Sequence, residues 1–534
     1  MKILSHLFSV LVLAAILIST GCTKNNRNVD ELKNDGFVSV EGRKIIAPDG
    51  GQIILHGINV VNKNPEEKYL GHITRDDFAM FSSWGFNVVR LGIIWDGLEP
   101  EPGVYNESYL KGIDEMIGWA AENDIYIFLD MHQDLYSVKF SDGAPEWATL
   151  DEGKEHLRGE IWSDSYLISP AVQTAFDNFW KNAPASDGTG IQDHYINLWK
   201  HIAQRYADNK TVIGYDIMNE PFPGSTANQV MPIMLGSYAM MMMEQTGQAP
   251  PSEEELMMMW STQREEVLKT LSTAEAYRKI IDPVEPVNVA FEKGPLMGFY
   301  QKARDAIRQV DTHHIIFIEH SYFTNMGVPG GLQNLVDENG NKDPLVVYAA
   351  HGYDLVVDTD ALTRGSDERV RLIFDRVNET SIRLDIPVLV GEWGALHGES
   401  PEMADPAQVL VGEFNKHLFN DTFWAFYRGI KDMPFFEVIK KPYVQRVPGT
   451  LISYRLDFET NVFDCVWEED PALSGPAKIW VPDLSVLSED DIEVSPAGAR
   501  IELEALENTT SGYVIVTSEG KTEERSLKLK LGVE

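Results

Sequence analysis

Long apolar runs alternate with amphipathic segments over most of this chain. Residues 73–84, 109–123 and 372–385 carry apolar side chains at intervals of about 3.6 residues, which predicts helices. The runs between such segments are continuously apolar, which is typical of strands buried on both faces. These runs are residues 52–62, 85–95, 124–132, 211–221, 314–320, 345–354, 386–394 and 422–429. Eight alternations of strand and helix predict an α/β fold, a (β/α)8 TIM barrel.

The pattern changes near residue 440. The segments "KIWVPDL", "RIELEAL", "GYVIVTSEG" and "RSLKLKLGV" are short, alternate polar and apolar residues, and are separated by turns. Such segments are typical of antiparallel strands with one buried face. We therefore expect a C-terminal β-sandwich domain over residues 439–534. It could support the barrel or bind a substrate or surface, and the sequence leaves both roles open.

The first residues resemble an export signal. A basic start is followed by an apolar run from Leu7 to Ile18, and small residues precede Cys22 in "STGC". This pattern predicts a lipoprotein signal peptide over 1–21 and lipidation of Cys22. Ser19 departs from the usual leucine, so ordinary signal cleavage is the alternative.

If Cys22 is lipidated, residues 22–36 form a tether. We expect the barrel domain over residues 37–438. The protein would then be a lipid-anchored bacterial envelope protein, in the periplasm or at the cell surface, with the anchor in the membrane. Cys465 is the only other cysteine, so no internal disulfide is expected.

Length and net charge indicate the number of domains and argue against some classes of partner. The 534 residues exceed what one hydrophobic core usually serves, which agrees with two domains. The formal net charge of −37 argues against nucleic acid as a partner, because phosphate binding requires basic surface. We expect a monomer that binds a small or lipid-linked substrate.

Polar residues gather where the predicted strands end. In a TIM barrel the carboxyl ends of the strands form the active face, so these side chains should meet at one mouth. A single buried histidine or arginine is more often a satisfied core residue, but a cluster at six strand ends is not explained by packing alone. The cluster comprises Arg90, His132, Asp134, Asn219, Glu220, His351, Tyr353, Glu392 and Trp424.

Two of these residues suggest glycoside hydrolysis. Glu220 and Glu392 each end a predicted strand, and a barrel can place them opposite each other. Paired carboxyl groups about 5 Å apart retain the anomeric configuration, and a wider gap inverts it. Asn219 could hold a sugar 2-hydroxyl beside Glu220, while Arg90 and Tyr353 could keep Glu392 ionised. We therefore assign Glu220 as acid/base and Glu392 as nucleophile.

Other features bear on the substrate. Trp424 and Trp162 are candidates for stacking on sugar rings. Ten of the 18 methionines lie between Met231 and Met297, within an insertion at 225–300 that directly follows the Glu220 strand end. Methionine suits irregular or adaptable apolar surfaces. The insertion could be an ordinary helical core or an apolar lid over a greasy substrate.

The ordered motifs resemble those of glycoside hydrolase family 5. Arg90, "NEP" at 219–221, "HGY" at 351–353, "GEW" at 391–393 and Trp424 follow the order of that family along the barrel. The chain is more specifically similar to the endoglycoceramidase-like branch, in "GINVVNKNP" at 57–65, "DMHQDLYS" at 130–137, "DGAPEWA" at 142–148, "AFDNFW" at 175–180 and "FYQKARDAIRQVD" at 299–311.

This resemblance implies retaining cleavage of the bond between glycan and ceramide, with no cofactor and no metal. It places Lys63 on the glycan and His132 and Asp134 along the sugar site. The chain departs from the branch at "WSDSYLIS" from Trp162, at "GEWGA", and at "HSYFTN" after Glu319.

Three functions remain to be weighed. The first is an endoglycoceramidase-type enzyme that releases an intact oligosaccharide. The second is an exo-acting β-glucosidase or glucosylceramidase on glucosyl lipids, or on steroid, triterpenoid or phenolic glycosides. The third is a surface lipoprotein that binds glycans without cutting them, which the presence of both glutamates disfavours. No Walker loop and no Cys/His metal spacing occurs in the sequence.

Overall fold

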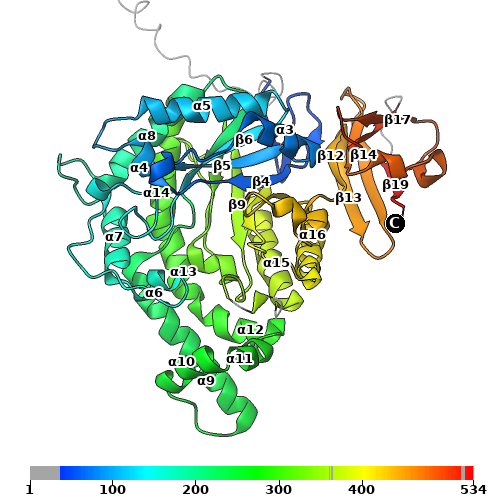
Figure 1. Ribbon diagram of the computed structural model, residues 1–534. Helices are drawn as coiled ribbons and strands as arrows, with labels where there is room; N and C mark the ends of the chain where they lie inside the picture. Colours follow the sequence, from blue (N-terminus) through cyan, green and yellow to red (C-terminus); the bar gives the residue numbers. More distant parts are fainter. Residues whose placement is uncertain (1–35, 360, 363–364, 519–523, 533–534) are drawn as a thin grey trace, which may run out of the picture.

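The computed structural model describes residues 36–359, 361–362, 365–518 and 524–532. The predicted signal peptide, Cys22 and all of the tether before Gly36 lie outside these residues. Eight parallel strands close into a barrel in the order β10–β11–β4–β5–β6–β7–β8–β9, which confirms the predicted TIM barrel (Figure 1). The strands are β4 (His56–Val60), β5 (Val88–Ile94), β6 (Tyr126–His132), β7 (Val212–Asp216), β8 (Ile315–Ile318), β9 (Val346–Gly352), β10 (Val388–Trp393) and β11 (Asn420–Phe423).

Amphipathic helices surround the barrel. Their starts follow capping chemistry: Asn106 accepts hydrogen bonds from two backbone N–H groups of α5, and Ser366 accepts one from α15. The predicted segments 73–84, 109–123 and 372–385 correspond to α3, α5 and α15. The main covering helices are α3 (Arg75–Ser83), α5 (Glu107–Ala121), α7 (Pro170–Trp180), α8 (Ile191–Tyr206), α14 (Met297–Ile307), α15 (Asp367–Leu384) and α16 (Ala404–His417).

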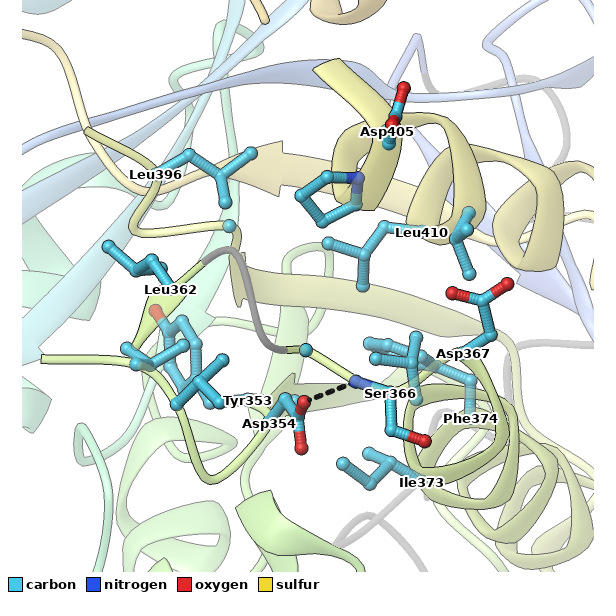
Figure 2. Close-up of a pocket in the computed structure, with 18 of the residues that line it drawn as sticks. Tyr353, Asp354, Leu362, Ser366, Asp367, Ile373, Phe374, Leu396, Asp405 and Leu410 are labelled. Atoms are coloured by element: carbon cyan, nitrogen blue, oxygen red, sulfur yellow. Dashed lines mark hydrogen bonds between the residues drawn. The ribbon is translucent and has the colours of Figure 1, made fainter. Parts of the chain in front are cut away.

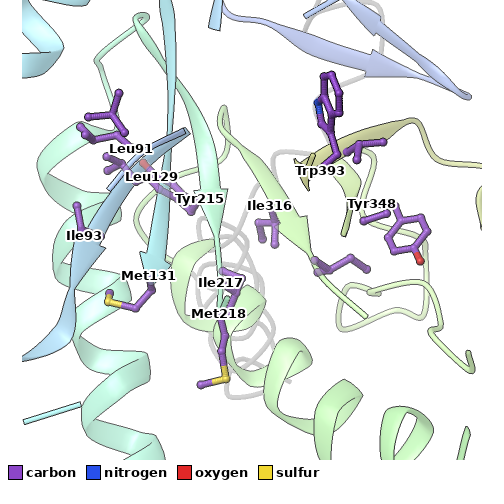
Figure 3. Packing of buried hydrophobic residues seen from close by; sticks show 14 of the residues in the cluster. Leu91, Ile93, Leu129, Met131, Tyr215, Ile217, Met218, Ile316, Tyr348 and Trp393 are labelled. Carbon is purple, nitrogen blue, oxygen red and sulfur yellow. The ribbon is translucent and has the colours of Figure 1, made fainter. Parts of the chain in front are cut away.

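Side chains alternate across the wall of the barrel. Leu91 and Ile93 of β5 and Leu129 and Met131 of β6 belong to the large core between strands and helices (Figure 3). Their strand neighbours face the barrel axis, where Val88, Phe128, Ile213, Phe317, Val347 and Leu389 form a separate apolar cluster. Because the side-chain period of a strand is two, the next inward positions above this cluster are polar. Those positions build the site.

The first predicted strand proves to be two strands. In the apolar run 52–62, β3 (Gln52–Ile53) pairs with β12 of the C-terminal sheet, and only β4 enters the barrel. Strands β1 (Ser39–Glu41) and β2 (Lys44–Ile46) pair with each other and then with β3. The N-terminal hairpin packs under the barrel, next to the C-terminal sheet. Strands that precede the barrel in sequence therefore belong to that sheet.

Two antiparallel sheets form the C-terminal sandwich. The first has the order β1–β2–β3–β12–β15–β18–β17 and the second β13–β14–β19–β16. Their shared core includes Trp467, Trp480 and Cys465, and Cys465 is a buried free thiol. The C-terminal strands are β12 (Tyr443–Val447), β13 (Gly449–Asp457), β14 (Val462–Glu469), β15 (Ala477–Val481), β16 (Ile492–Ser495), β17 (Arg500–Ala505), β18 (Gly512–Thr517) and β19 (Glu524–Lys530).

The methionine-rich insertion forms a helical lobe at one end of the barrel (Figure 1). Its helices are α9 (Val230–Thr246), α10 (Glu253–Thr262), α11 (Arg264–Thr270) and α12 (Ala274–Ile281). Met241 and other side chains of the lobe form a small core of their own, while Met240 and Met258 are 49% and 57% exposed. Within the described residues, no helix has the length and apolarity needed to span a membrane.

Candidate active site

Glu220 lies just past the end of β7, and its backbone conformation is unusual. Its φ of +44° falls in the left-handed region, which non-glycine residues rarely adopt. The Glu220 N–H donates to Oε2 of Glu319 at 2.8 Å, which helps to hold this conformation. Pro221 follows directly and has no N–H with which to extend the strand pairing. Backbone strain held by surrounding contacts is concentrated at functional sites.

Glu392 lies within β10, and its two carboxylate oxygens have different donors. Nη1 of Arg90 donates to Oε1 at 2.7 Å, and the Tyr353 hydroxyl donates to Oε2 at 3.0 Å. One carboxylate oxygen of Glu220, one of Glu392 and a ring nitrogen of His351 all lie within 4.8 Å of one another. This separation matches a retaining rather than an inverting pair.

Arg90 lies deeper than expected. The sequence placed it at a strand end, but it is the third residue of β5 and points into the barrel. Its guanidinium contacts four carboxylates, and it also donates to Oδ1 of Asn219 at 3.0 Å and of Asn59 at 3.2 Å. The carboxylates are Asp130, Asp216, Glu319 and Glu392. This fully buried cation therefore links the nucleophile to the loop that bears Glu220.

The surroundings of the two catalytic carboxyl groups are unequal. Burial is the largest cause that raises the pKa of Glu220, and the nearby Glu392 adds to it, so that the pKa reaches about 7 even though His351 opposes the rise. Burial alone would lower the pKa of His351, but Glu319 and Glu392 hold it well above the usual value. Glu220 is thus suited to carry a proton near neutral pH, beside Glu392, whose carboxylate oxygens accept from Arg90 and Tyr353.

A second group of predicted residues lines the mouth beside this pair. Lys63 binds Asp134, and its ammonium lies 5.0 Å from the ring centre of Trp424. The Trp424 ring stacks on His132 with centroids 5.2 Å apart. Burial opposes ionisation of Asp134, yet Lys63 and His132 lower its pKa to about 2. An ionised acceptor, a cation and a half-buried indole face therefore meet in one place, which suits a polyhydroxylated sugar.

Trp162 is the one predicted sugar-site residue that lies apart from both groups. It precedes α6 (Asp164–Ile168), is 45% exposed, and donates from its indole N–H to Oδ2 of Asp358 at 2.9 Å. Its ring meets Tyr166 edge-on at 6.2 Å. The structure thus places Trp162 on a rim that bridges the loops after β6 and β9.

A cavity of about 330 Å³ lies near Glu392, and its wall mixes apolar side chains with those of Asp354, Asp367 and Asp405 (Figure 2). Tyr353, which binds Glu392, forms part of its wall. Leu362, Phe374, Leu396 and Leu410 contribute apolar surface, and α15 and α16 enclose the far side. Its lining suits a group that has both apolar and polar parts.

Several functional side chains were missed by sequence reasoning. Asn59, Asp130, Asp216 and Glu319 all contact Arg90 inside the barrel. The available signal was a carboxylate within an otherwise apolar strand, as in "FLDMH" and "GYDIM". Asn325 was also missed: its Nδ2 donates to Oε1 of Glu220 at 2.6 Å.

Three buried clusters of the described residues have the donor atoms of a metal site, namely His132–Asp134–Asp142, Glu220–His351–Glu392 and Asp130–Asp216–Glu319. A protein cation already contacts each of them. Lys63 lies against the first, the imidazole of His351 is itself a member of the second, and Arg90 lies within the third. Each cluster thus contains or contacts a basic side chain of the chain itself.

Comparison with known proteins places the chain in a family. Over 216 residues it is 34% identical to an endoglycoceramidase of Cyanea nozakii, covering 35% of this chain and 42% of that protein. Over 431 residues it is 27% identical to a glucosylceramidase of Aspergillus fumigatus, covering 59% of this chain and 56% of that one. The chain therefore spans about half the length of these curated relatives.

The structural similarity extends over nearly the whole chain. Endo-glycoceramidase II from Rhodococcus sp., in a complex with a cellobiose-like imidazole, superposes with a TM-score of 0.69 at 25% identity, covering 91% of this chain and 98% of that one. Residues 48–429 match the family described as Cellulase (glycosyl hydrolase family 5). That range contains the barrel and every side chain of the site described above, and the chain belongs to glycosyl hydrolase family 5.

Proposed function

We propose that this protein is a retaining β-glycosidase that hydrolyses the bond between a glycan and ceramide in glycosphingolipids. The observation that carries the proposal is the pair Glu220 and Glu392, with carboxylate oxygens within 4.8 Å and unequal surroundings. A retaining enzyme needs one protonated and one ionised carboxyl group at this distance. Burial supplies the first at Glu220, and two donors support the second at Glu392.

The reaction follows from these roles in two steps. In the first, Glu392 forms a bond to the anomeric carbon while the bond to the ceramide oxygen breaks and Glu220 gives its proton to that oxygen. In the second, Glu220 takes a proton from water, the water oxygen binds the anomeric carbon, and the bond to Glu392 breaks. The anomeric configuration is inverted twice and so retained.

Asn219 can stabilise the transition state through a hydrogen bond to the sugar. Its Oδ1 accepts from Arg90, and its Nδ2 donates one hydrogen to the carbonyl oxygen of Gln133 at 3.0 Å. An amide nitrogen has two hydrogens, so the second can donate to the sugar 2-hydroxyl. Hydrogen bonds to this hydroxyl strengthen as the oxocarbenium character develops.

The names of the relatives and the apolar part of the cavity wall beside Tyr353 support a lipid leaving group. The first curated relatives and the superposed structure are named endoglycoceramidases. Leu362, Phe374, Leu396 and Leu410 in the wall of this cavity offer apolar surface for part of a lipid. Ceramide requires such surface, since each methylene removed from water contributes about 0.8 kcal/mol.

Exo-acting glucosylceramide hydrolysis is the second candidate. A match over 431 residues is to the Aspergillus fumigatus glucosylceramidase. Both candidates use the same chemistry and differ in whether the mouth accepts sugars beyond the first.

The test incubates the protein, beside a Glu392→Gln variant, with lactosylceramide, a longer ganglioside and glucosylceramide in mild detergent. Mass spectrometry identifies both products. Intact disaccharide or oligosaccharide with free ceramide supports the endo activity, and glucose released from glucosylceramide alone supports the exo activity. Absence of turnover on all three lipids would refute both.

We also propose that the protein is exported and lipidated at Cys22, and that it acts as a monomer in the bacterial envelope. The motif "STGC" supports the first part. Labelling cells with a fatty-acid analogue should mark the protein but not a Cys22→Ala variant, and light scattering of the purified protein should give the mass of one chain.

A further inference from the structure

The loop after β8 carries a polar chain of contacts that ends on the catalytic acid. Nδ2 of Asn325 donates to Oε1 of Glu220 at 2.6 Å, and Oδ1 of Asn325 lies 2.8 Å from Nε2 of His320. Nδ1 of His320 contacts the hydroxyl of Tyr348. All four residues are buried. His320 and Asn325 belong to "HSYFTN", where this chain departs from the branch it resembles.

The chemistry of the groups sets the direction of each hydrogen bond. The Asn325 carbonyl oxygen can only accept, so Nε2 of His320 carries the hydrogen and Nδ1 accepts from Tyr348. Burial lowers the pKa of His320 to about 3, with a contribution from the nearby charge of His351, so this ring is neutral and has a single N–H. An N–H at Nε2 of His320 matches the amide orientation in which Asn325 presents its NH2 group to Glu220.

Oε1 of Glu220 receives two donors. Besides Asn325, Nδ1 of His351 lies at 3.0 Å, and Nε2 of the same ring lies 3.3 Å from Oε1 of Glu319. Both ring nitrogens lie close to carboxylates, and because a carboxylate oxygen can only accept, Nδ1 of His351 donates to Oε1 of Glu220. With both lone pairs of Oε1 engaged, a proton on Glu220 has its place on Oε2, where none of the described residues donates.

We propose, building on the proposed glycosidase function, that Asn325 is a positioning residue: oriented by His320 and Tyr348, it confines the catalytic proton to Oε2 of Glu220 and stabilises the carboxylate after that proton has left. Stabilisation of the carboxylate matters because Glu220 must next act as a base and take a proton from water. A charge-assisted N–H donor favours the ionised form over the neutral one.

The loop is held independently of this chain of contacts. The buried carboxylate of Glu292 accepts from the backbone N–H of Ser321 at 2.9 Å and from the hydroxyl of Thr324 at 3.0 Å. Nδ2 of Asn288 also donates to the Thr324 hydroxyl, at 2.8 Å. The loop thus has anchors that do not touch Glu220, and these provide a control.

Other charged and titratable groups also face Glu220, and the variants leave them in place. They are Asp134, Glu319, Glu392, His351, Tyr166, Tyr322 and Tyr353. A shift seen on changing Asn325 alone is therefore assignable to the lost donor.

The experiment titrates Glu220 in the full chain, labelled with ¹³C at glutamate carboxyl groups, and follows the signal that disappears in Glu220→Gln. In Asn325→Leu, which has a similar shape and no amide, the midpoint should rise by about one pH unit or more. Asn325→Asp replaces a donor by an acceptor and should raise it further. His320→Phe frees the amide to rotate and should raise it as well. Asn288→Leu, the matched control, should leave it unchanged.

The basic limb of the pH profile of kcat/KM should move with the titration. An unchanged midpoint in folded Asn325→Leu, or an equal rise in Asn288→Leu, would overturn the role of Asn325, and an unchanged midpoint in His320→Phe would overturn the orienting role of His320. The titration needs no substrate. Failure of the unsubstituted protein to turn over any β-glycoside would instead refute the proposed function.

Discussion

Replacing Glu220 by glutamine separates acid catalysis from the rest of the reaction. The glutamine carbonyl oxygen can take the place of Oε1 and keep the hydrogen bonds from Asn325 at 2.6 Å and His351 at 3.0 Å. The amide nitrogen replaces Oε2, which then has no acidic proton to give. Because size and contacts are conserved, the variant should fold and bind substrate while lacking the acid.

The size of the effect depends on the leaving group. Ceramide departs as a primary alcohol, and a positioned acid contributes about 10²–10⁴-fold to such a step, or about 3–5 kcal/mol. Burial raises the pKa of Glu220 from 4.5 to about 7, so the unsubstituted enzyme should lose kcat/KM as the pH rises through 7. The variant should lack this basic limb, because it has no proton to lose.

A dinitrophenyl glycoside needs no proton for departure. With this substrate, formation of the glycosyl intermediate on Glu392 should proceed at nearly the unsubstituted rate, while its hydrolysis slows because the base is missing. Stopped-flow measurement should show a burst of dinitrophenol, and azide should restore turnover by attacking the intermediate without a base.

Comparison of the two substrates tests whether Glu220 acts as a general acid. An equal loss on lactosylceramide and on the dinitrophenyl lactoside would show that Glu220 supports binding or folding and does not act as an acid. Glu392→Gln is the control, since loss of the nucleophile should reduce both reactions alike.

Three further predictions concern other parts of the molecule. Lys63→Met removes the cation beside Asp134 and should raise KM for the glycan about tenfold with little change in kcat, measured on soluble lactosides; a change in kcat alone would contradict a binding role. Tyr353→Phe removes the hydroxyl that donates to Oε2 of Glu392, so kcat on soluble lactosides should fall about tenfold, and an unchanged kcat would contradict a role for this contact. Trp467→Ala opens the sandwich core and should cost about 3–5 kcal/mol of unfolding free energy, seen as a lower midpoint in denaturant, with kcat of the folded protein unchanged; an unchanged midpoint would contradict its place in that core.

Periodicity was sufficient for the barrel because each strand and helix is specified locally. A run such as "IIFI" at 315–318 is apolar on both faces whatever its neighbours are, and eight strand runs alternating with helices have few alternative arrangements. Glu220 and Glu392 could be assigned for the same reason: each follows or lies in an apolar run at the position that a barrel brings to its mouth.

The sequence did not predict which strands pair with one another. The run from Gln52 to Asn62 looks uniform, yet β3 joins the sandwich and β4 the barrel, because strand pairing depends on β12 and β11, which lie more than 350 residues away. Local hydrophobicity carries no information about that choice.

The sequence by itself determined the fold class and indicated the candidate catalytic pair and sugar-site residues of this protein. Only the tertiary structure decided how Arg90 is surrounded by four carboxylates and which donors Glu220 receives. Asn325 and His351 are 105 and 131 positions away from Glu220, and both reach its Oε1. The protonation of a buried carboxyl group follows from the donors and charges within a few ångströms of it, and these are set by closure of the barrel.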